Sequence, residues 1–457
     1  MCGIVGIWNA PKAAEKTFLA LHALQHRAQD YAGIATHDGS HFHWARDHGL
    51  VSEVFAKRDT LNMLHGWNAV GHLRYPTVEE KTYARDAGDP DPNMQPIRGL
   101  WQHTEFFLAH NGNITNVPHL RMLVKDKATR LKTDMDSEII VRLIEQQRPS
   151  SFLLCLEQVL KRVRGSYSLV ILLPTALIAV RGPEGNRPLV YGYNEEHGFS
   201  IIASESCALD AVDARYIGEV RSGTAEVFTI NGRQTPHRFT EPRLKRCSFE
   251  LPYYSHVTSD VFGKSVADWR MRAGKRLEEL HPVPHADLVI GVPDSGITLA
   301  QGWATSGRSG RVSVSAVAKS GYAQRTFIAR SQTLRAERVR MKFLFSRSEL
   351  EGKTVVLLDD SIVRLTTMPE VVSRVRKAGA KEVHVRVAFP PIRHPCLYGI
   401  DTPTRAELSA ANLSKKEMLK KVGADTLEFL DLDSLLSLSG DEPGTWCTAC
   451  VTGKYWH

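Results

Sequence analysis

Apolar positions divide the chain into two parts with different patterns. In the first half, "CGIVGIW" and "SYSLVILL" predict short strands, and "MDSEIIVRLIEQQ" has the period of an amphipathic helix. In the second half, "ADLVIGV", "KTVVLLDD" and "KEVHVRVAF" are almost continuously apolar and alternate with helical patterns. Such strands indicate a parallel sheet with helices on both faces. The polar stretch "RQTPHRFTEPRLKRC" predicts a boundary within residues 235–250, giving domains at 2–240 and 241–457.

Length and composition agree with two domains. A chain of 457 residues is too long for one ordinary core. The sequence has no run of roughly 18 apolar residues, so it predicts no membrane span. The N-terminal segment "MCGIVGIWNA" lacks the basic and apolar regions of a secretory signal. We therefore expect a cytoplasmic protein with no membrane partner. The net charge of +8 comes from scattered lysines and arginines, which argues against nucleic-acid binding but leaves a phosphate-rich small molecule open.

The segment "LLDDSIVRLTTM" places two acids, Asp359 and Asp360, directly after an apolar strand. A loop with hydroxyls follows, and Thr367 with Glu370 forms a capping-box pattern at the start of a helix. Free backbone N–H groups at a helix start favour an anion, and adjacent carboxylates can accept hydrogen bonds from ribose hydroxyls. The pattern predicts a sugar-phosphate site. The alternative is an acidic strand end followed by a capped helix.

Cys2 directly follows the initiator methionine. Removal of Met1 would place a thiol and a free amine on one carbon, and such an amine can act as general base for its own nucleophile. The alternative is a small buried residue that begins a strand.

Five segments in order, "MCGIVGI", "LQHRAQDYAGI", "GHLRYPT", "HNGNITN" and "DSE", resemble the N-terminal-nucleophile glutamine amidotransferases. The resemblance implies an α+β first domain with αββα layers and Cys2 as the nucleophile. An arginine can clamp the glutamine carboxylate, and a side-chain amide with a neighbouring N–H can stabilise an oxyanion. Taken alone, "HNGN" also suits an ordinary turn. The implied glutamine-binding residues are Arg74, Thr77, Asn111, Gly112 and Asp136.

"VVLLDDSIVRLTT" resembles the phosphoribosyl-pyrophosphate loop of the type I phosphoribosyltransferases, which implies an α/β second domain with a parallel sheet. With "GVPDSG", "GYAQRTFI", "HPCLYGID" and "CTACVTGKY", the likeness extends to the amidophosphoribosyltransferase family over essentially the whole chain. It implies that ammonia from glutamine displaces pyrophosphate to give 5-phosphoribosylamine, the first step of purine synthesis. The implied Mg²⁺ residues are Ser295, Asp359 and Asp360, and the implied phosphoribosyl-pyrophosphate residues are Asp359, Asp360, Ser361, Thr366, Thr367 and Lys319.

Seven cysteines in a long chain without an export signal favour metal binding or catalysis over disulfides. By resemblance, four of them match the ligands of a [4Fe–4S] cluster found in one branch of the family. From the residues alone, four thiolates suit either such a cluster or zinc. Cys155 and Cys207 are expected in the core. The resemblance also implies glutamine and phosphoribosyl pyrophosphate as partners, nucleotide effectors and a homo-oligomer. The four matching cysteines are Cys247, Cys396, Cys447 and Cys450.

Several positions depart from the family pattern. Leu365 stands where a phosphate-loop glycine is usual, and Met368 stands where a small polar residue is usual. Ser320-Gly321 replaces Asn-Arg, Gln324 replaces a glycine, and Val78-Glu79 follows "RYPT" without a glycine hinge. Three hypotheses remain open: an amidophosphoribosyltransferase, an amidotransferase with a changed ammonia acceptor, and a non-catalytic homologue that keeps the fold.

Overall fold

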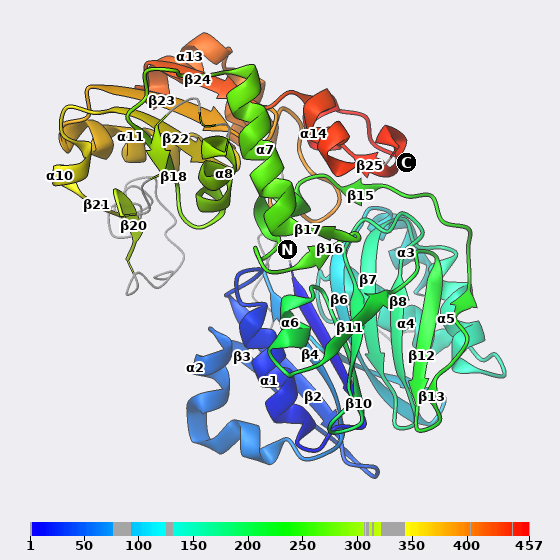
Figure 1. The fold of residues 1–457 in the computed structure, drawn as a ribbon. Helices are drawn as coiled ribbons and strands as arrows, with labels where there is room; N and C mark the ends of the chain where they lie inside the picture. The colour runs from blue at the N-terminus through cyan, green and yellow to red at the C-terminus, as the bar shows by residue number, and fades with distance from the viewer. Residues whose placement is uncertain are drawn as a thin grey trace.

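The computed structural model describes residues 2–75, 93–124, 131–305, 307, 310–312, 315–320, 343–402, 404–440 and 442–456. Two lobes are evident in Figure 1, one formed by the first half of the chain in blue to green and the other by the rest of the chain in green to red. No helix among these residues is long and apolar enough to span a membrane.

Two antiparallel sheets form the first lobe (Figure 1). The first sheet has the order β11 (Arg215–Glu219), β9 (Val190–Asn194), β10 (Phe199–Ala203), β1 (Gly3–Trp8), β4 (Asn68–Arg74), β2 (Tyr31–His37) and β3 (Phe42–His48). The second has the order β13 (Gly232–Arg233), β12 (Thr224–Thr229), β8 (Leu177–Arg181), β7 (Gly165–Leu172), β6 (Thr104–Ile114) and β5 (Ile97–Trp101), with β14 (His237–Arg238) beside β12.

Apolar residues fill three layers of this lobe. Ile4 and Ile202 of the first sheet pack with Val170 and Leu177 of the second. Helices α1 (Ala13–Ala23), α2 (Val51–Ala56) and α6 (Cys207–Asp210) cover the outer face of the first sheet. Helices α4 (Asp136–Gln146) and α5 (Phe152–Leu160) cover the second. The αββα prediction is therefore confirmed.

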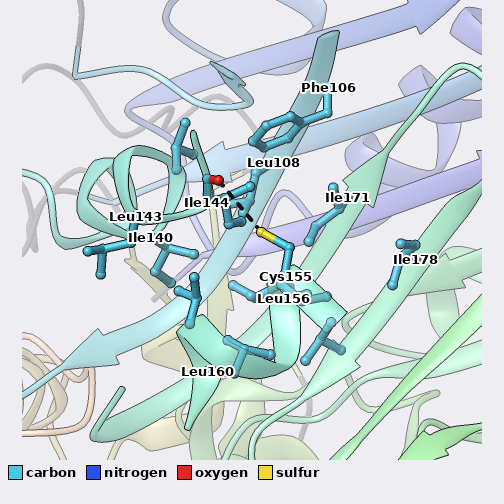
Figure 2. Packing of buried hydrophobic residues seen from close by; sticks show 14 of the residues in the cluster. Phe106, Leu108, Ile140, Leu143, Ile144, Cys155, Leu156, Leu160, Ile171 and Ile178 are labelled. Atoms are coloured by element: carbon cyan, nitrogen blue, oxygen red, sulfur yellow. Dashed lines mark hydrogen bonds between the residues drawn. The ribbon is translucent and has the colours of Figure 1, made fainter. Parts of the chain in front are cut away.

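Cys155 lies in the outer layer beside the second sheet, as Figure 2 shows. Its side chain is fully buried, and its Sγ donates a weak hydrogen bond of 3.6 Å to the carbonyl oxygen of Ile144. Cys207 is also buried, at 7% exposure. Both cysteines are core residues, as the sequence predicts.

A five-stranded parallel sheet forms the second lobe, with the order β19 (Arg311–Val312), β18 (Leu288–Gly291), β22 (Thr354–Asp359), β23 (Glu382–Val387) and β24 (Thr426–Phe429). Val356 and Leu358 pack in one core with α7 (Val266–Leu280), α8 (Ser295–Ala304) and α14 (Leu432–Ser439). Val355 and Leu357 pack in another with α11 (Thr367–Lys377) and α13 (Lys415–Val422). Because alternate residues of one strand enter opposite cores, the prediction of helices on both faces is confirmed.

The start of α11 differs from the sequence prediction. Thr366, not Thr367, occupies the cap position, and no side chain caps the helix. Thr366 has a helical backbone with φ −99° and ψ −45°, and its hydroxyl lies 3.5 Å from the carbonyl oxygen of Arg364. A capping side chain needs an extended backbone to reach the first free N–H groups, so the predicted capping box is wrong. Gly379, with φ +101°, follows the helix end, where glycine is common.

Candidate functional site

Cys2 precedes β1 and is half-buried. Its backbone N–H lies 3.3 Å from Oδ1 of Asn111, which is in β6. Asn111 is completely buried, and its Nδ2 has no hydrogen-bond partner among the described residues. Leaving a buried donor unpaired costs stability unless a ligand meets it. The arrangement therefore offers an amide N–H to a ligand oxygen close to the Cys2 backbone.

Gly112 follows Asn111 with φ +151°, and a Cβ built there would lie 2.0 Å from the carbonyl oxygen of Ser166. Only glycine fits this approach between strands. The ordinary-turn interpretation of "HNGN" is wrong, because these residues continue β6 and pair with β7, with Gly112 opposite Tyr167. Sheet pairing determines the backbone here more strongly than the turn preference of Asn-Gly.

His110 is a site residue to which the sequence assigned no role. It is buried, with Nδ1 2.8 Å from Oγ of Ser137 and 3.7 Å from Oδ1 of Asp136. Burial alone would lower the pKa of His110, but the charge and hydrogen bonding of Asp136, with a further contribution from Cys2, raise it. The available signal was its position as the first residue of "HNGNITN".

Asp136 begins α4 and accepts the backbone N–H of Ile114 at 2.9 Å. Burial would raise the pKa of Asp136, but His110 and these hydrogen bonds lower it to about 2. Its carboxylate is therefore charged at neutral pH and lies beside His110. The first turn of a helix further favours negative charge.

Arg74 ends β4 and is 8% exposed. Gly3 pairs with Leu73 in the antiparallel register, so Arg74 lies opposite Cys2. Its guanidinium carbon is 5.5 Å from the ring centre of Tyr31. Thr77, Val78 and Glu79 lie outside the described residues. The structure thus brings Cys2, Arg74, Asn111, Gly112 and Asp136 to one region.

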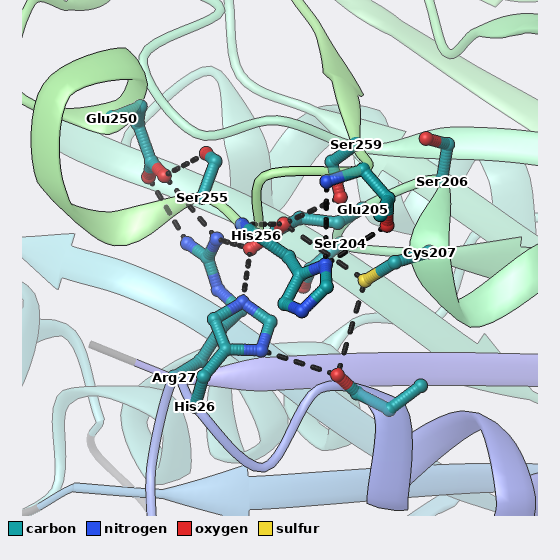
Figure 3. A network of polar contacts seen from close by, with 12 residues as sticks. His26, Arg27, Ser204, Glu205, Ser206, Cys207, Glu250, Ser255, His256 and Ser259 are labelled. Atoms are coloured by element: carbon teal, nitrogen blue, oxygen red, sulfur yellow. Dashed lines mark hydrogen bonds and ion pairs between the residues drawn. The ribbon is translucent and has the colours of Figure 1, made fainter. Parts of the chain in front are cut away.

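A buried network of charges, drawn in Figure 3 around Arg27, Glu205 and Glu250, contacts the Cys2 backbone. Nε of Arg27 donates to the carbonyl oxygen of Cys2 at 3.0 Å. The same guanidinium forms a short ion pair with Glu205 and one of 3.0 Å with Glu250, and all three side chains are completely buried. Arg187 adds a contact of 3.3 Å to Glu250. Because Glu250 follows the predicted domain boundary, the network joins the two halves of the chain.

Asp359 and Asp360 lie at the carboxyl end of β22 and are 9% and 6% exposed. Oδ2 of Asp360 accepts a short hydrogen bond from Oγ of Ser295, the first residue of α8. Ser361 donates to Oδ1 of Asp360 at 2.5 Å. Carboxylate and hydroxyl oxygens are ligands that suit Mg²⁺, so Ser295, Asp359 and Asp360 fit that ion.

Lys319 ends β20 (Val317–Lys319), which pairs with β21 (Phe343–Phe345). Its Nζ lies 2.6 Å from Oδ2 of Asp294, the residue before Ser295. Lys319 is therefore held beside the start of α8, where Ser295 lies. Ser320 follows it, whereas Gly321 and Gln324 lie outside the described residues.

Leu365 has φ +48°, in the left-handed region that favours glycine. Its side chain is half-buried and packs against the core below α11. Met368 is only 2% exposed and lies in that core. Of these two departures from the family pattern, Leu365 places a leucine in a backbone conformation that favours glycine, and Met368 fills part of the core. Thr366 and Thr367 remain half-buried at the start of α11.

The segment 396–401 contacts the region around Cys2 and Gly112. A Cβ on Gly399 would lie 3.1 Å from the backbone of Gly112. The side-chain amide of Asn113 donates to the carbonyl oxygen of Leu397 at 3.0 Å. Tyr75 approaches Asp401 at 3.4 Å, and Arg364 of the hydroxyl loop lies 3.6 Å from the same carboxylate oxygen. The contacts connect the region around Cys2 with the loop after β22.

Four cysteines surround one cavity. Strand β15 (Arg246–Cys247) pairs with β25 (Trp446–Cys447), which places Cys247 beside Cys447. The cavity is lined by all four predicted ligands, together with Arg187 and Tyr398. Burial raises the pKa of Cys247 to about 11, although the cationic Arg187 lowers it in part. The guanidinium can therefore offset thiolate charge in the cavity.

The spacing of these thiols can be compared with what the two candidate groups, zinc and a [4Fe–4S] cluster, require. One zinc ion with Zn–S bonds of about 2.3 Å holds its sulfurs roughly 3.8 Å apart. Among the described residues, no three of these thiols lie within 4.8 Å of one another. A polynuclear cluster can be held by four thiolates that line one cavity without meeting at a single ion. The residues that line it are therefore suited to a [4Fe–4S] group.

Comparisons with known proteins cover the whole chain. Family models match residues 84–211 as a glutamine amidotransferase domain and residues 275–399 as a phosphoribosyl transferase domain. An amidophosphoribosyltransferase of Methanocaldococcus jannaschii is 39% identical over 100% of this chain and 97% of its own. A chloroplastic one of Glycine max is 40% identical over 99% and 78%. The solved structure named glutamine phosphoribosylpyrophosphate amidotransferase from B. subtilis, complexed with ADP and GMP, has a TM-score of 0.89 at 38% identity and covers 99% and 97% of the two chains. This chain therefore belongs to the amidophosphoribosyltransferase family.

Proposed function

We propose that the chain transfers ammonia from glutamine to phosphoribosyl pyrophosphate, giving 5-phosphoribosylamine and pyrophosphate at the start of purine synthesis. The observation that carries this proposal is the buried Nδ2 of Asn111, which has no hydrogen-bond partner in the described part of the chain, while Oδ1 of the same amide accepts from the Cys2 N–H. The same chain places Asp360, which accepts a hydrogen bond from Ser295, at the carboxyl end of β22. The first feature suits the release of ammonia from glutamine, and the second suits the binding of phosphoribosyl pyrophosphate.

In the first step, the Cys2 amine, once Met1 is removed, accepts the proton of the thiol. The sulfur then attacks the amide carbon of glutamine. The Nδ2–H of Asn111 and the N–H of Gly112 stabilise the oxyanion, because buried donors act strongly where water is excluded. The C–N bond breaks, ammonia leaves with the transferred proton, and water hydrolyses the glutamyl thioester to glutamate.

Glutamine is held by charge at its other end. We propose that Arg74 binds its α-carboxylate and Asp136 its ammonium group, with Thr77 adding a hydroxyl contact. The low pKa of Asp136, about 2, keeps this carboxylate ionised throughout the physiological range. An arginine can hold a carboxylate at two points, which orients the amide toward Cys2.

In the second step, ammonia passes inside the protein and attacks C1 of the ribose while the bond to pyrophosphate breaks. Asp359 and Asp360 accept hydrogen bonds from the ribose hydroxyls. Lys319 contacts the pyrophosphate. Ser295, Asp359 and Asp360 would hold Mg²⁺, which would neutralise the negative charge of the departing pyrophosphate. The residues that receive the 5′-phosphate at the start of α11 are Ser361, Thr366 and Thr367.

We further propose that Cys247, Cys396, Cys447 and Cys450 hold a [4Fe–4S] cluster, which would tie the C-terminal segment to the rest of the protein. The test is iron and sulfide content after anaerobic purification. Cys396→Ser should lower both to a small fraction of the wild-type value. The control Cys155→Ser, in the core of the other lobe, should retain them. Equal iron content in the two variants would contradict the assignment.

Other features remain predictions. The B. subtilis structure is named as a complex with ADP and GMP, which supports nucleotide effectors for this chain. A homo-oligomer, the division at 2–240 and 241–457, and a cytoplasmic location also remain predictions. Some plant relatives are named as chloroplastic.

The function is tested by following glutamine consumption with and without phosphoribosyl pyrophosphate and Mg²⁺, together with pyrophosphate release. Cys2→Ala should abolish glutamine use while ammonium still supports pyrophosphate release. Glutamine hydrolysis without pyrophosphate release would favour the changed acceptor, for which Leu365 at φ +48° is the specific observation. A cluster-loaded protein with neither activity would indicate a non-catalytic homologue.

A further inference from the structure

Three potential metal ligands meet at the amino end of the parallel sheet. His285 lies in the loop before β18, and Glu382 and His384 are the first and third residues of β23. Residues two apart in a strand share a face, so Glu382 and His384 point the same way. Their ligand atoms and that of His285 all lie within 4.8 Å of one another.

We propose that His285, Glu382 and His384 bind a divalent transition-metal ion, represented by Zn²⁺. Tetrahedral zinc with bonds of 2.0–2.1 Å holds its ligand atoms roughly 3.3 Å apart. Oε2 of Glu382 is 3.0 Å from Nε2 of His285 and 3.3 Å from Nε2 of His384. Two of the three separations already match that geometry. Imidazole ligands favour zinc over magnesium or calcium, and the fourth position is open to water.

The surroundings of His384 suit a metal ligand. Its Nδ1 lies 2.9 Å from Oγ1 of Thr426 on the neighbouring strand β24. That hydroxyl can accept the Nδ1–H, which leaves the lone pair of Nε2 for the ion. The His384 side chain is 8% exposed, whereas that of His285 is 62% exposed. One imidazole is therefore fixed in the fold, and the other completes the site from the surface.

Charges near the site act in both directions. Nζ of Lys381 is 4.0 Å from the Glu382 carboxylate, and Arg386 donates to Thr426 at 2.8 Å. Both cations oppose a bound metal. Asp425, which accepts the backbone N–H of Val383 at 2.7 Å, adds negative charge on the same side. The carboxylate of Glu382 supplies the direct counter-charge.

This site is separate from the phosphoribosyl region. In the parallel register, Glu382 lies beside Thr354, and Val387 lies beside Asp359. Five residues at about 3.3 Å each place Asp359 roughly 16 Å further along the sheet. A metal ion would join the loop before β18 to β23, which lie on either side of β22. The expected role is to stabilise this lobe, apart from the chemistry at Asp359.

The test is equilibrium dialysis of cluster-loaded protein against Zn²⁺ in excess Mg²⁺, which occupies the aspartate corner. His285→Asn and Glu382→Gln should each weaken one zinc-binding event at least tenfold. The control His197→Asn removes an exposed imidazole far along the sequence and should bind zinc as the wild type does. All cysteines remain in every variant, so differences report the His-Glu-His set alone.

Thermal unfolding gives a second readout. Zn²⁺ should raise the Tm of the wild type and the His197 variant, with a smaller rise in the two ligand variants. Identical zinc stoichiometry, affinity and Tm shift in all four proteins would overturn the proposal. Because His285 is exposed, its substitution keeps the test informative even where a core variant would misfold.

Discussion

Nε of Arg27 donates a hydrogen bond of 3.0 Å to the carbonyl oxygen of Cys2. The position of the proposed nucleophile therefore depends on a buried arginine. Glu205 and Glu250 compensate the buried charge of that arginine, and Glu250 comes from beyond the predicted boundary. The geometry around Cys2 is thus coupled to the docking of the two halves of the chain.

Glu250→Gln should destabilise the protein by about 3–5 kcal/mol, the scale for breaking a buried ion pair. The substitution keeps the shape but leaves Arg27 and Arg187 with less compensation. Urea denaturation measures the change. The control is Glu195→Gln, whose pair with Arg215 is two-thirds exposed and whose loss should change stability by less than about 1 kcal/mol. Equal effects would contradict the importance of the network.

Asn111→Ala should lower kcat for glutamine hydrolysis by about 10²–10³-fold, the effect of removing one oxyanion donor. KM should change little, because the interaction strengthens only in the transition state. Asn116→Ala serves as the matched control, since its amide donates to the carbonyl oxygen of Arg162. A loss confined to KM would show that Asn111 binds the ground state instead.

Stability should depend on pH through His110. Its folded pKa is raised above the ordinary value of 6.5, so its protonated form is favoured by folding. This contribution is complete below about pH 6.5 and is lost as pH rises through the folded pKa. The difference in unfolding free energy between wild type and His110→Asn should therefore be larger at about pH 6 than at about pH 8.5. A difference that does not vary with pH would refute the raised pKa.

Asp136→Asn provides the companion measurement for that prediction. It removes the carboxylate whose charge favours protonated His110. Burial should then dominate and lower the His110 pKa, which NMR titration of labelled histidine can follow. An unchanged titration would show that Asp136 is not the cause.

Leu365→Gly should bind phosphoribosyl pyrophosphate more tightly, by up to about tenfold for roughly 1.4 kcal/mol. Leucine at φ +48° is strained, whereas glycine adopts this conformation freely. Leu365→Ala separates the causes, because alanine removes bulk but keeps the Cβ. Tighter binding in the glycine variant alone would identify backbone strain as the cause. Equally tighter binding in both variants would identify the bulk of the leucine side chain. Unchanged or weaker affinity in the glycine variant would contradict the claim that Leu365 hinders binding of phosphoribosyl pyrophosphate.

The sequence predicts those features that depend on local pattern. Alternate residues Val355 and Val356 enter opposite cores, as a continuously apolar parallel strand should. The same local reasoning is wrong at Thr367, where a residue with suitable capping chemistry lies inside the helix. At Asn111, a turn-like dipeptide continues a strand because its partner strand determines the backbone.

Long-range contacts are the part that local patterns do not predict. Arg27 meets Glu205 and Glu250 across separations of 178 and 223 residues. The hydrophobic periodicity of the sequence does not predict such pairs, which become neighbours only in the folded chain. The burial of Met368 has the same origin, because the core that α11 covers decides which of its side chains face inward. The sequence motifs identify the reactive side chains, whereas the packing of the folded chain determines their positions.

The central claim is that glutamine hydrolysis is coupled to transfer onto phosphoribosyl pyrophosphate. The most direct test measures glutamate and pyrophosphate formed by cluster-loaded wild-type protein with glutamine, phosphoribosyl pyrophosphate and Mg²⁺. Coupling predicts that the two products form in equal amounts and that omitting glutamine stops both. Glutamate formation without pyrophosphate would contradict the claim.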